Sequence, residues 1–267
     1  MDERPIGIFD SGIGGLTVFK EVSRLLPAEH IVYLGDTARV PYGIRSPETV
    51  IRYSFECARF LMLNGIKLLV VACNTASAVS LDEIRRSLPV PVIGVIEPGA
   101  QAAVASTRNR RIGVIGTEAT VRSGAYVTEI RRLDGTVEVI SIPCPLFVPL
   151  VEEGWTDGEI ARLVAEKYLS VMRGQGPDTL VLGCTHYPLL KAVIGGVMGA
   201  VSLIDSAVEV AKVAGGLLGD SDGLRVSGGK PTYRFFVTDS PHKFISVGER
   251  FLGGKIGDIE KVAVSEM

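Results

Sequence analysis

The 267-residue chain lacks several features that mark particular classes of protein. It has four cysteines, three histidines and one tryptophan, and no apolar run approaches the roughly 20 residues that span a bilayer. Lys and Arg (28) nearly balance Asp and Glu (30), so the formal net charge is −2. A protein that holds nucleic acid through its phosphates needs a basic face. We therefore expect neither a nucleic-acid partner nor a membrane partner.

The amino terminus and the cysteines point to the same compartment. Residues 1–5 are polar and lead directly into a predicted strand, so no signal peptide is predicted and a cytoplasmic location is expected. In such a chain free thiols are more typical than disulfides. Cys184 and His186 lack the further pair of cysteines that structural zinc requires, so no metal site is expected. The four cysteines are Cys57, Cys73, Cys144 and Cys184.

A strand pattern that ends in a cysteine occurs twice. Residues 68–77 (LLVVACNTAS) and 179–187 (TLVLGCTHY) each join an apolar run to a small residue, a cysteine and then hydroxyl or amide side chains. Each pattern predicts a buried strand that delivers a cysteine to a strand-to-helix turn. Ligands bind at the carboxyl ends of strands in open α/β sheets. One buried cysteine alone is more often a small core side chain, so it is the matched pair that indicates a site.

The repeat includes the flanking strands and predicts the fold class. Corresponding residues are separated by 106, 111 and 108 positions, for the pairs Ile6 and Ile112, Cys73 and Cys184, and Glu97 and Asp205. The pattern predicts an α/β fold with two similar, mostly parallel α/β domains related by pseudo-two-fold symmetry, with the active site in the cleft between them. The last predicted strands have no counterpart in mid-chain. We therefore assign residues 1–97 plus 208–267 to the first domain and residues 98–207 to the second.

Helix starts are predicted from capping residues. Ser46 with Pro47 is a favourable cap and first-turn pair, while Thr156 with Glu159 and Ser206 with Glu209 fit the capping box. Residues 97–99 (EPG) are expected to form the crossing into the second half. A helix that begins at Cys73 is expected to lower the thiol pKa, and the same reasoning applies to Cys184.

Two facing thiols suit one reaction in particular. Inversion of a carbon stereocentre removes a proton from one face and delivers a proton to the other, so it needs two acid/base groups on opposite walls. A duplicated scaffold with one cysteine in each half supplies that arrangement, with one thiolate and one thiol that exchange roles for the reverse direction.

Five separated segments also carry a resemblance. They are residues 8–15 (IFDSGIGG), 36–43 (DTARVPYG), 72–76 (ACNTA), 183–188 (GCTHYP) and 249–253 (ERFLG). Together they resemble the glutamate racemases of the aspartate/glutamate racemase superfamily, over essentially the whole chain. The resemblance implies a cofactor-independent enzyme that interconverts L-glutamate and D-glutamate and supplies D-glutamate for peptidoglycan. It is also compatible with a homodimer.

The resemblance assigns roles residue by residue. Cys73 and Cys184 match the two proton donors and acceptors, Asp10 the group that assists Cys73, and His186 the group that assists Cys184. A further acid falls on Glu152, although an adjacent pair of glutamates by itself favours a solvated surface. The residues that match substrate-binding positions are Asp10, Ser11, Tyr42, Gly43, Asn74, Thr75, Thr117, Thr120, Thr185 and His186.

Three alternatives remain open at this point. A racemase of aspartate or of hydantoins would share the scaffold and both cysteines. The turn at Asp10-Ser11-Gly12 could be a phosphate loop of a nucleotide-dependent transferase, with both cysteines in the core. A binding or regulatory protein with a vestigial site is the third.

Overall fold

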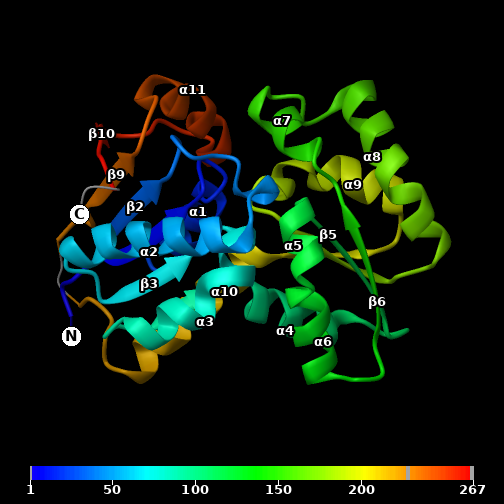
Figure 1. Ribbon diagram of the computed structural model, residues 1–267, viewed down its shortest axis with the longest axis horizontal. Coiled ribbons are helices and arrows are strands. Elements are labelled where there is room, and N and C mark those ends of the chain that lie inside the picture. Colours follow the sequence, from blue (N-terminus) through cyan, green and yellow to red (C-terminus); the bar gives the residue numbers. More distant parts are fainter. Residues whose placement is uncertain (1, 227–228, 265–267) are drawn as a thin grey trace.

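The computed structural model describes residues 2–226 and 229–264 and contains two parallel sheets (Figure 1). The order of the six-stranded sheet is β10-β9-β2-β1-β3-β4, and that of the four-stranded sheet is β6-β5-β7-β8. Every strand pair is parallel, so the predicted fold class is confirmed. The strands are β1 Ile6–Asp10, β2 Ile31–Gly35, β3 Leu68–Val71, β4 Val92–Gly94, β5 Arg111–Gly116, β6 Glu138–Pro143, β7 Thr179–Gly183, β8 Ser202–Asp205, β9 Tyr233–Val237 and β10 Ile259–Lys261.

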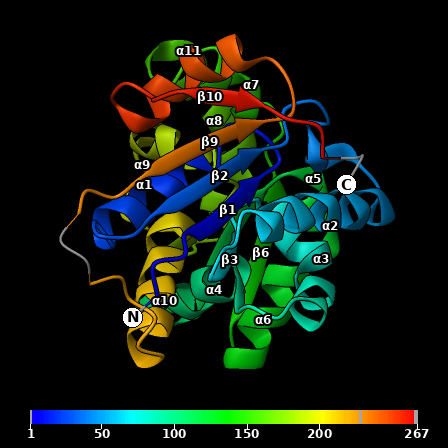
Figure 2. The ribbon, with the colours of Figure 1, turned by 90° about the vertical axis from the view of Figure 1, so that its left-hand side faces the viewer.

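The two ends of the chain build one sheet together. Figure 2 shows β9 and β10, in orange and red, beside the blue strand β2, while β5 to β8 of the middle of the chain form the other sheet. A discontinuous first domain requires this arrangement, although its boundaries at 97 and 207 stay a prediction. Residues 1, 227–228 and 265–267, which the predicted first domain includes, lie outside the described part of the chain.

Helices cover the sheets, and the central strands β1, β3 and β7 are buried along their whole length. This burial explains why these strands are continuously apolar, with little alternation. Among residues 2–226 and 229–264, no helix has the length and apolar character needed to cross a membrane. The helices are α1 Leu16–Leu25, α2 Pro47–Leu63, α3 Asn74–Ser87, α4 Ile96–Ser106, α5 Glu118–Ser123, α6 Ala125–Leu133, α7 Phe147–Glu152, α8 Gly158–Gly174, α9 Lys191–Met198, α10 Ser206–Asp220 and α11 Pro241–Leu252, with 3-10 turns η1 Tyr42–Ile44 and η2 Tyr187–Leu190.

The capping residues were predicted correctly for one helix and wrongly for two. Ser46 caps α2 by accepting a hydrogen bond from the Thr49 amide. The cap of α10 is Asp205, which accepts from the Ala207 amide at 2.9 Å and leaves the Ser206 hydroxyl free for another contact. Helix α8 begins at Gly158, so the residue at its cap position is Asp157, which makes no capping hydrogen bond through its side chain, and Thr156 lies one position before it.

Two helices connect the sheets. Helix α4 leads from β4 to β5, α10 lies between β8 and β9, and the two helices pack against each other. Residues 97–99, predicted as the crossing into the second half, form the first turn of α4, which leads from the six-stranded sheet to the four-stranded sheet. Pro98 is compatible with that turn because the amide it lacks would have no helical partner there.

Candidate active site

A cavity of about 150 Å³ lies where the carboxyl ends of the two sheets face each other. The residues that follow β1 and β3 form one wall, and those that follow β5 and β7 form the other. The structure thus brings together most of the side chains proposed from the sequence. Those in its wall are Ser11, Tyr42, Gly43, Cys73, Asn74, Thr75, Thr117, Cys184, Thr185 and His186.

Three proposed residues stand behind this wall. Asp10 has no exposed surface, and its carboxylate accepts from the Gly12 amide at 2.9 Å and from the Thr185 hydroxyl at 3.4 Å. Thr120 lies behind Thr75 and Thr117. Glu152 contacts the far side of the His186 ring. These three residues therefore hold the wall in place in the absence of substrate.

Tyr42 lines the cavity, but its hydroxyl points away from it. The phenol donates to the carboxylate of Asp36, which is fully buried and also paired with Arg39. A substrate contact from Tyr42 would therefore come from its main chain or its ring. The network instead stiffens the loop that ends at Gly43.

Cys73 is surrounded by groups that keep it protonated. Its sulfur lies 3.4 Å from the Ser11 hydroxyl, to which the thiol donates. Burial and the nearby charge of Asp10 raise the pKa of the thiol to about 12. The expectation of a lowered pKa was wrong. The hydrogen bonds of Cys73 with Ser11 and with the Ala76 amide of the helix lower the pKa, but burial and the charge of Asp10 raise it by more. Cys73 is therefore a thiol at neutral pH.

Cys184 lies beside a cation. Its sulfur is 3.8 Å from Nδ1 of His186, whose Nε2 is 3.4 Å from the Glu152 carboxylate. Burial acts to lower the pKa of His186, but the hydrogen bonds with Cys184 and Glu152 outweigh burial and raise it to about 10. At neutral pH the ring is an imidazolium, which attracts negative charge on the neighbouring sulfur. The chain after Cys184 forms the 3-10 turn η2, so no α-helix begins there.

Glu152 is part of this charge arrangement, and the surface interpretation of the residue was wrong. Its second carboxylate oxygen lies 3.4 Å from Nζ of Lys243 on α11, and its main-chain oxygen accepts from Arg250 at 2.6 Å. The hydrogen bond with His186 contributes most to lowering the Glu152 pKa. The adjacent Glu153 is exposed, which distinguishes the two glutamates.

Hydroxyl and amide groups supply the remaining polar surface of the cavity. The hydroxyls of Thr75, Thr117 and Thr120 lie within 2.9 to 3.2 Å of one another. The Nδ2 atom of Asn74 is buried and has no hydrogen-bond partner among the described residues. No Lys or Arg lines the cavity within the described chain. The site is therefore built to accept a ligand with carboxylate oxygens through neutral donors.

Close contact between the two halves depends on Gly14 and Thr17. A Cβ atom at Gly14 would overlap the Thr185 hydroxyl and Nδ1 of His186. The Thr17 hydroxyl donates to the main-chain oxygen of Thr185 at 3.0 Å. Sequence reasoning found the glycines of this turn but missed Thr17, because a threonine in the first turn of a helix has no distinguishing pattern. It likewise missed Tyr126, which contacts Asn74 from behind, and Ser206, which contacts Tyr126.

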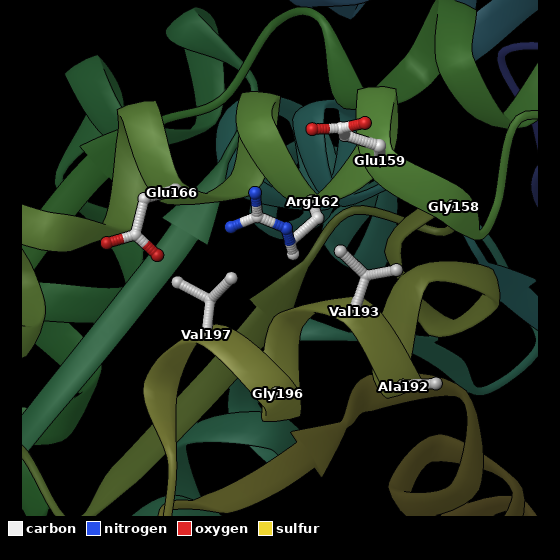
Figure 3. A pocket seen from close by; sticks show the side chains of 8 residues that line it. All are labelled: Gly158, Glu159, Arg162, Glu166, Ala192, Val193, Gly196 and Val197. Carbon is white, nitrogen blue, oxygen red and sulfur yellow. The ribbon is translucent and has the colours of Figure 1, made fainter.

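A larger hollow of about 600 Å³ lies elsewhere, between α8 and α9 (Figure 3). Arg162 extends into it between Glu159 and Glu166, opposite Val193 and Val197 on α9. It shares no residue with the cavity at the cysteines and contains neither a thiol nor an imidazole. The chemistry of the side chains thus assigns the active site to the smaller cavity.

The architecture resembles that of known racemases. Residues 6–214 match the family model described as Asp/Glu/Hydantoin racemase. A glutamate racemase of Geobacter metallireducens is 57% identical over 265 residues, which cover 99% of this chain and 98% of the relative. The crystal structure of glutamate racemase from Francisella tularensis in complex with D-glutamate has a TM-score of 0.95 at 41% identity and covers 100% of both chains.

A more distant structure extends the comparison. Glutamate racemase of Escherichia coli, in complex with L-glutamate and an activator, has a TM-score of 0.79 at 29% identity and covers 97% of this chain and 98% of that chain. Fold, paired thiols and family match define the class, and the chain belongs to the Asp/Glu/hydantoin racemase family. Within this family it groups with the glutamate racemases, which match it over its whole length.

The contact between Glu152 and His186 leads to a pH prediction. Because the His186 pKa is raised, the imidazolium is present at neutral pH and is lost as the pH rises through about 10. Glu152→Gln removes one cause of the raised pKa, so the alkaline limb of the rate profile should move to lower pH. The measurement is kcat/KM for racemisation against pH. Glu153→Gln is the matched control, and an unmoved limb in Glu152→Gln would contradict the assignment.

Proposed function

We propose that the protein interconverts L-glutamate and D-glutamate by proton transfer at Cα between Cys73 and Cys184, without a cofactor. The observation that carries this proposal is one cysteine on each wall of one cavity, with Ser11 beside Cys73 and His186 beside Cys184. Peptidoglycan synthesis, which consumes D-glutamate, is the process it would serve, in the cytoplasm. The absence of a lysine from the described cavity wall supports cofactor independence, because a pyridoxal Schiff base needs one.

The resting state follows from these surroundings. Cys184, whose sulfur lies 3.8 Å from Nδ1 of His186, is our choice for the base that takes the proton from one face of Cα. Cys73 holds its proton and delivers it to the carbanion from the opposite face. The C–H bond broken on one side is thus replaced by a C–H bond on the other. Afterwards Cys73 is the thiolate and Cys184 the thiol, which is the starting state for the reverse reaction.

The polar surface of the cavity suits glutamate. The relative from Francisella tularensis was solved with D-glutamate, and the donors here are hydroxyls, main-chain amides and the Asn74 amide. We assign carboxylate binding to Ser11, Gly43, Asn74, Thr75, Thr117 and Thr185, with Thr120 behind them. Asp10 is a fully buried carboxylate whose charge acts on Cys73, and it is our choice to attract the substrate ammonium. Tyr42 supports Gly43 from behind.

Incubation of the purified, cofactor-free protein with L-glutamate in D₂O tests this function. We expect D-glutamate that carries deuterium at Cα, because each inversion delivers a proton that has exchanged with solvent. Chirality and α-deuterium are followed together. Inversion of aspartate but not of glutamate would retain the mechanism and replace the substrate. Glutamate binding without exchange or inversion would favour a vestigial site, and inversion only with added pyridoxal phosphate would overturn cofactor independence.

A further inference from the structure

The amide of Asn74 is held from behind by a chain of buried hydroxyls. The Tyr126 hydroxyl, on α6, donates to Oδ1 of Asn74 at 2.7 Å, and the Ser206 hydroxyl, on α10, lies 3.0 Å from the same phenol oxygen. Ser206 also lies 3.4 Å from the Leu182 oxygen of β7. Asn74, Tyr126 and Ser206 are only 3%, 2% and 3% exposed. Water therefore cannot replace any of these bonds.

The hydrogen bonds from Ser206 through Tyr126 to Asn74 run in one direction. A phenol has one proton, and Tyr126 uses it for Asn74, so the contact between Tyr126 and Ser206 is a hydrogen bond when the serine donates to the phenol oxygen at 3.0 Å rather than to the Leu182 oxygen at 3.4 Å. With Oδ1 of Asn74 occupied, both amide protons on Nδ2 face away from Tyr126. Nδ2 is the buried atom that lacks a partner, and Asn74 lines the cavity. In the reversed orientation Asn74 would present an acceptor to the ligand, which repels a carboxylate.

We propose that Tyr126, supported by Ser206, is a positioning residue that fixes the Asn74 amide with its N–H groups toward the substrate carboxylate. This inference rests on the proposed function. Helix α6 packs against α4, and Asn74 belongs to the turn that also carries Cys73. The bond from Tyr126 therefore joins the four-stranded half to the substrate-binding wall of the six-stranded half. The amide acquires its binding orientation only when both halves are in contact.

Tyr126→Phe tests the proposal because it removes the hydroxyl and keeps the ring. We expect kcat/KM for glutamate to fall by about tenfold, mainly through a higher KM, since an unrestrained amide can present its oxygen to the substrate. In an Asn74→Ala background the same substitution should change kcat/KM by less than about twofold, because no amide remains to be oriented. Tyr233→Phe, on β9 and away from the cavity, is the control for loss of a tyrosine hydroxyl.

Two results would overturn the proposal. One is an unchanged KM in Tyr126→Phe. The other is an equal loss of kcat/KM from Tyr126→Phe in the presence and in the absence of the Asn74 side chain, which would indicate that Tyr126 has only a structural role. If Tyr126→Phe fails to fold, Ser206→Ala in both backgrounds decides the question, with an expected rise in KM of about threefold that requires Asn74. The assay of the wild-type protein distinguishes failure of this proposal from failure of the proposed function. If the protein inverts an amino acid other than glutamate, the same comparison of single and double variants can be made with that amino acid.

Discussion

Replacement of Cys73 or Cys184 by alanine should reduce the kcat of racemisation by about a thousandfold or more, in both directions. Each thiol acts once in every turnover, as acid or as base, and such a positioned group contributes on the order of 10² to 10⁴ in rate. Of the described residues that line the cavity, only Cys73 and Cys184 carry a thiol, so neither variant keeps a second thiol to take over the missing proton transfer. The assay is polarimetric or coupled measurement of inversion starting from each enantiomer.

Proton exchange adds a sharper criterion to the same experiment. Cys73→Ala retains Cys184 with His186 at 3.8 Å, so in D₂O it should exchange the α-hydrogen of one enantiomer and produce no inversion. Cys184→Ala should lose exchange of that enantiomer. Cys144→Ala, a buried thiol outside the cavity wall, is the matched control. Near wild-type inversion by either active-site variant would refute the two-thiol mechanism.

Lys67→Met should lower the free energy of unfolding by about 3–5 kcal/mol, because it leaves a buried carboxylate without its cation. Nζ of Lys67 lies 2.6 Å from Glu29, both side chains are 1% exposed, and Nζ also donates to the main-chain oxygens of Asp2 and Gly223. The residue precedes β3, at the end opposite Cys73. The kcat per folded molecule should therefore be unchanged.

Denaturant unfolding of Lys67→Met beside Lys212→Met measures this effect. Lys212 pairs with Glu209 at 2.9 Å on the surface of α10, where the lysine side chain is 60% exposed, and such pairs contribute at most about 1 kcal/mol. An equal decrease in the free energy of unfolding in the two variants would show that the buried pair contributes no more to stability than the exposed pair. A gain in stability for Lys67→Met would show that the desolvation of the ion pair exceeds its attraction.

The paired strands at Cys73 and Cys184 show what sequence alone could predict. An apolar run with a polar residue at its end is a local pattern, and parallel sheets place all such ends at one edge. The fold class and the position of both thiols follow from that geometry. The family resemblance supplied Asp10, His186 and Glu152, and the structure brings the last two into contact.

The pKa of Cys73 and the role of Tyr126 show what could not be predicted. Whether helix amides or burial decides the charge of a thiol depends on how completely the two halves exclude water, which no local pattern records. Tyr126 looks like an ordinary apolar residue of an amphipathic helix. Its contact with Asn74 spans 52 positions of sequence and exists only through the packing of one half on the other.

Helices α4 and α10 both lie in chain segments that connect the two sheets. They pack against each other at one side of the molecule (Figure 1). At the opposite side α7 and α11 are joined by the contacts that Glu152 makes with Lys243 and Arg250. A rotation of one half relative to the other about α4 and α10 would break these contacts. It would also break the hydrogen bonds that Thr17, Thr75 and Tyr126 make between the two halves. Cys73 would keep its contact with Ser11 within the six-stranded half, and Cys184 would keep its contact with His186 within the four-stranded half. Each half therefore holds one cysteine with its polar neighbour, and the packing of the two halves places both thiols in one cavity.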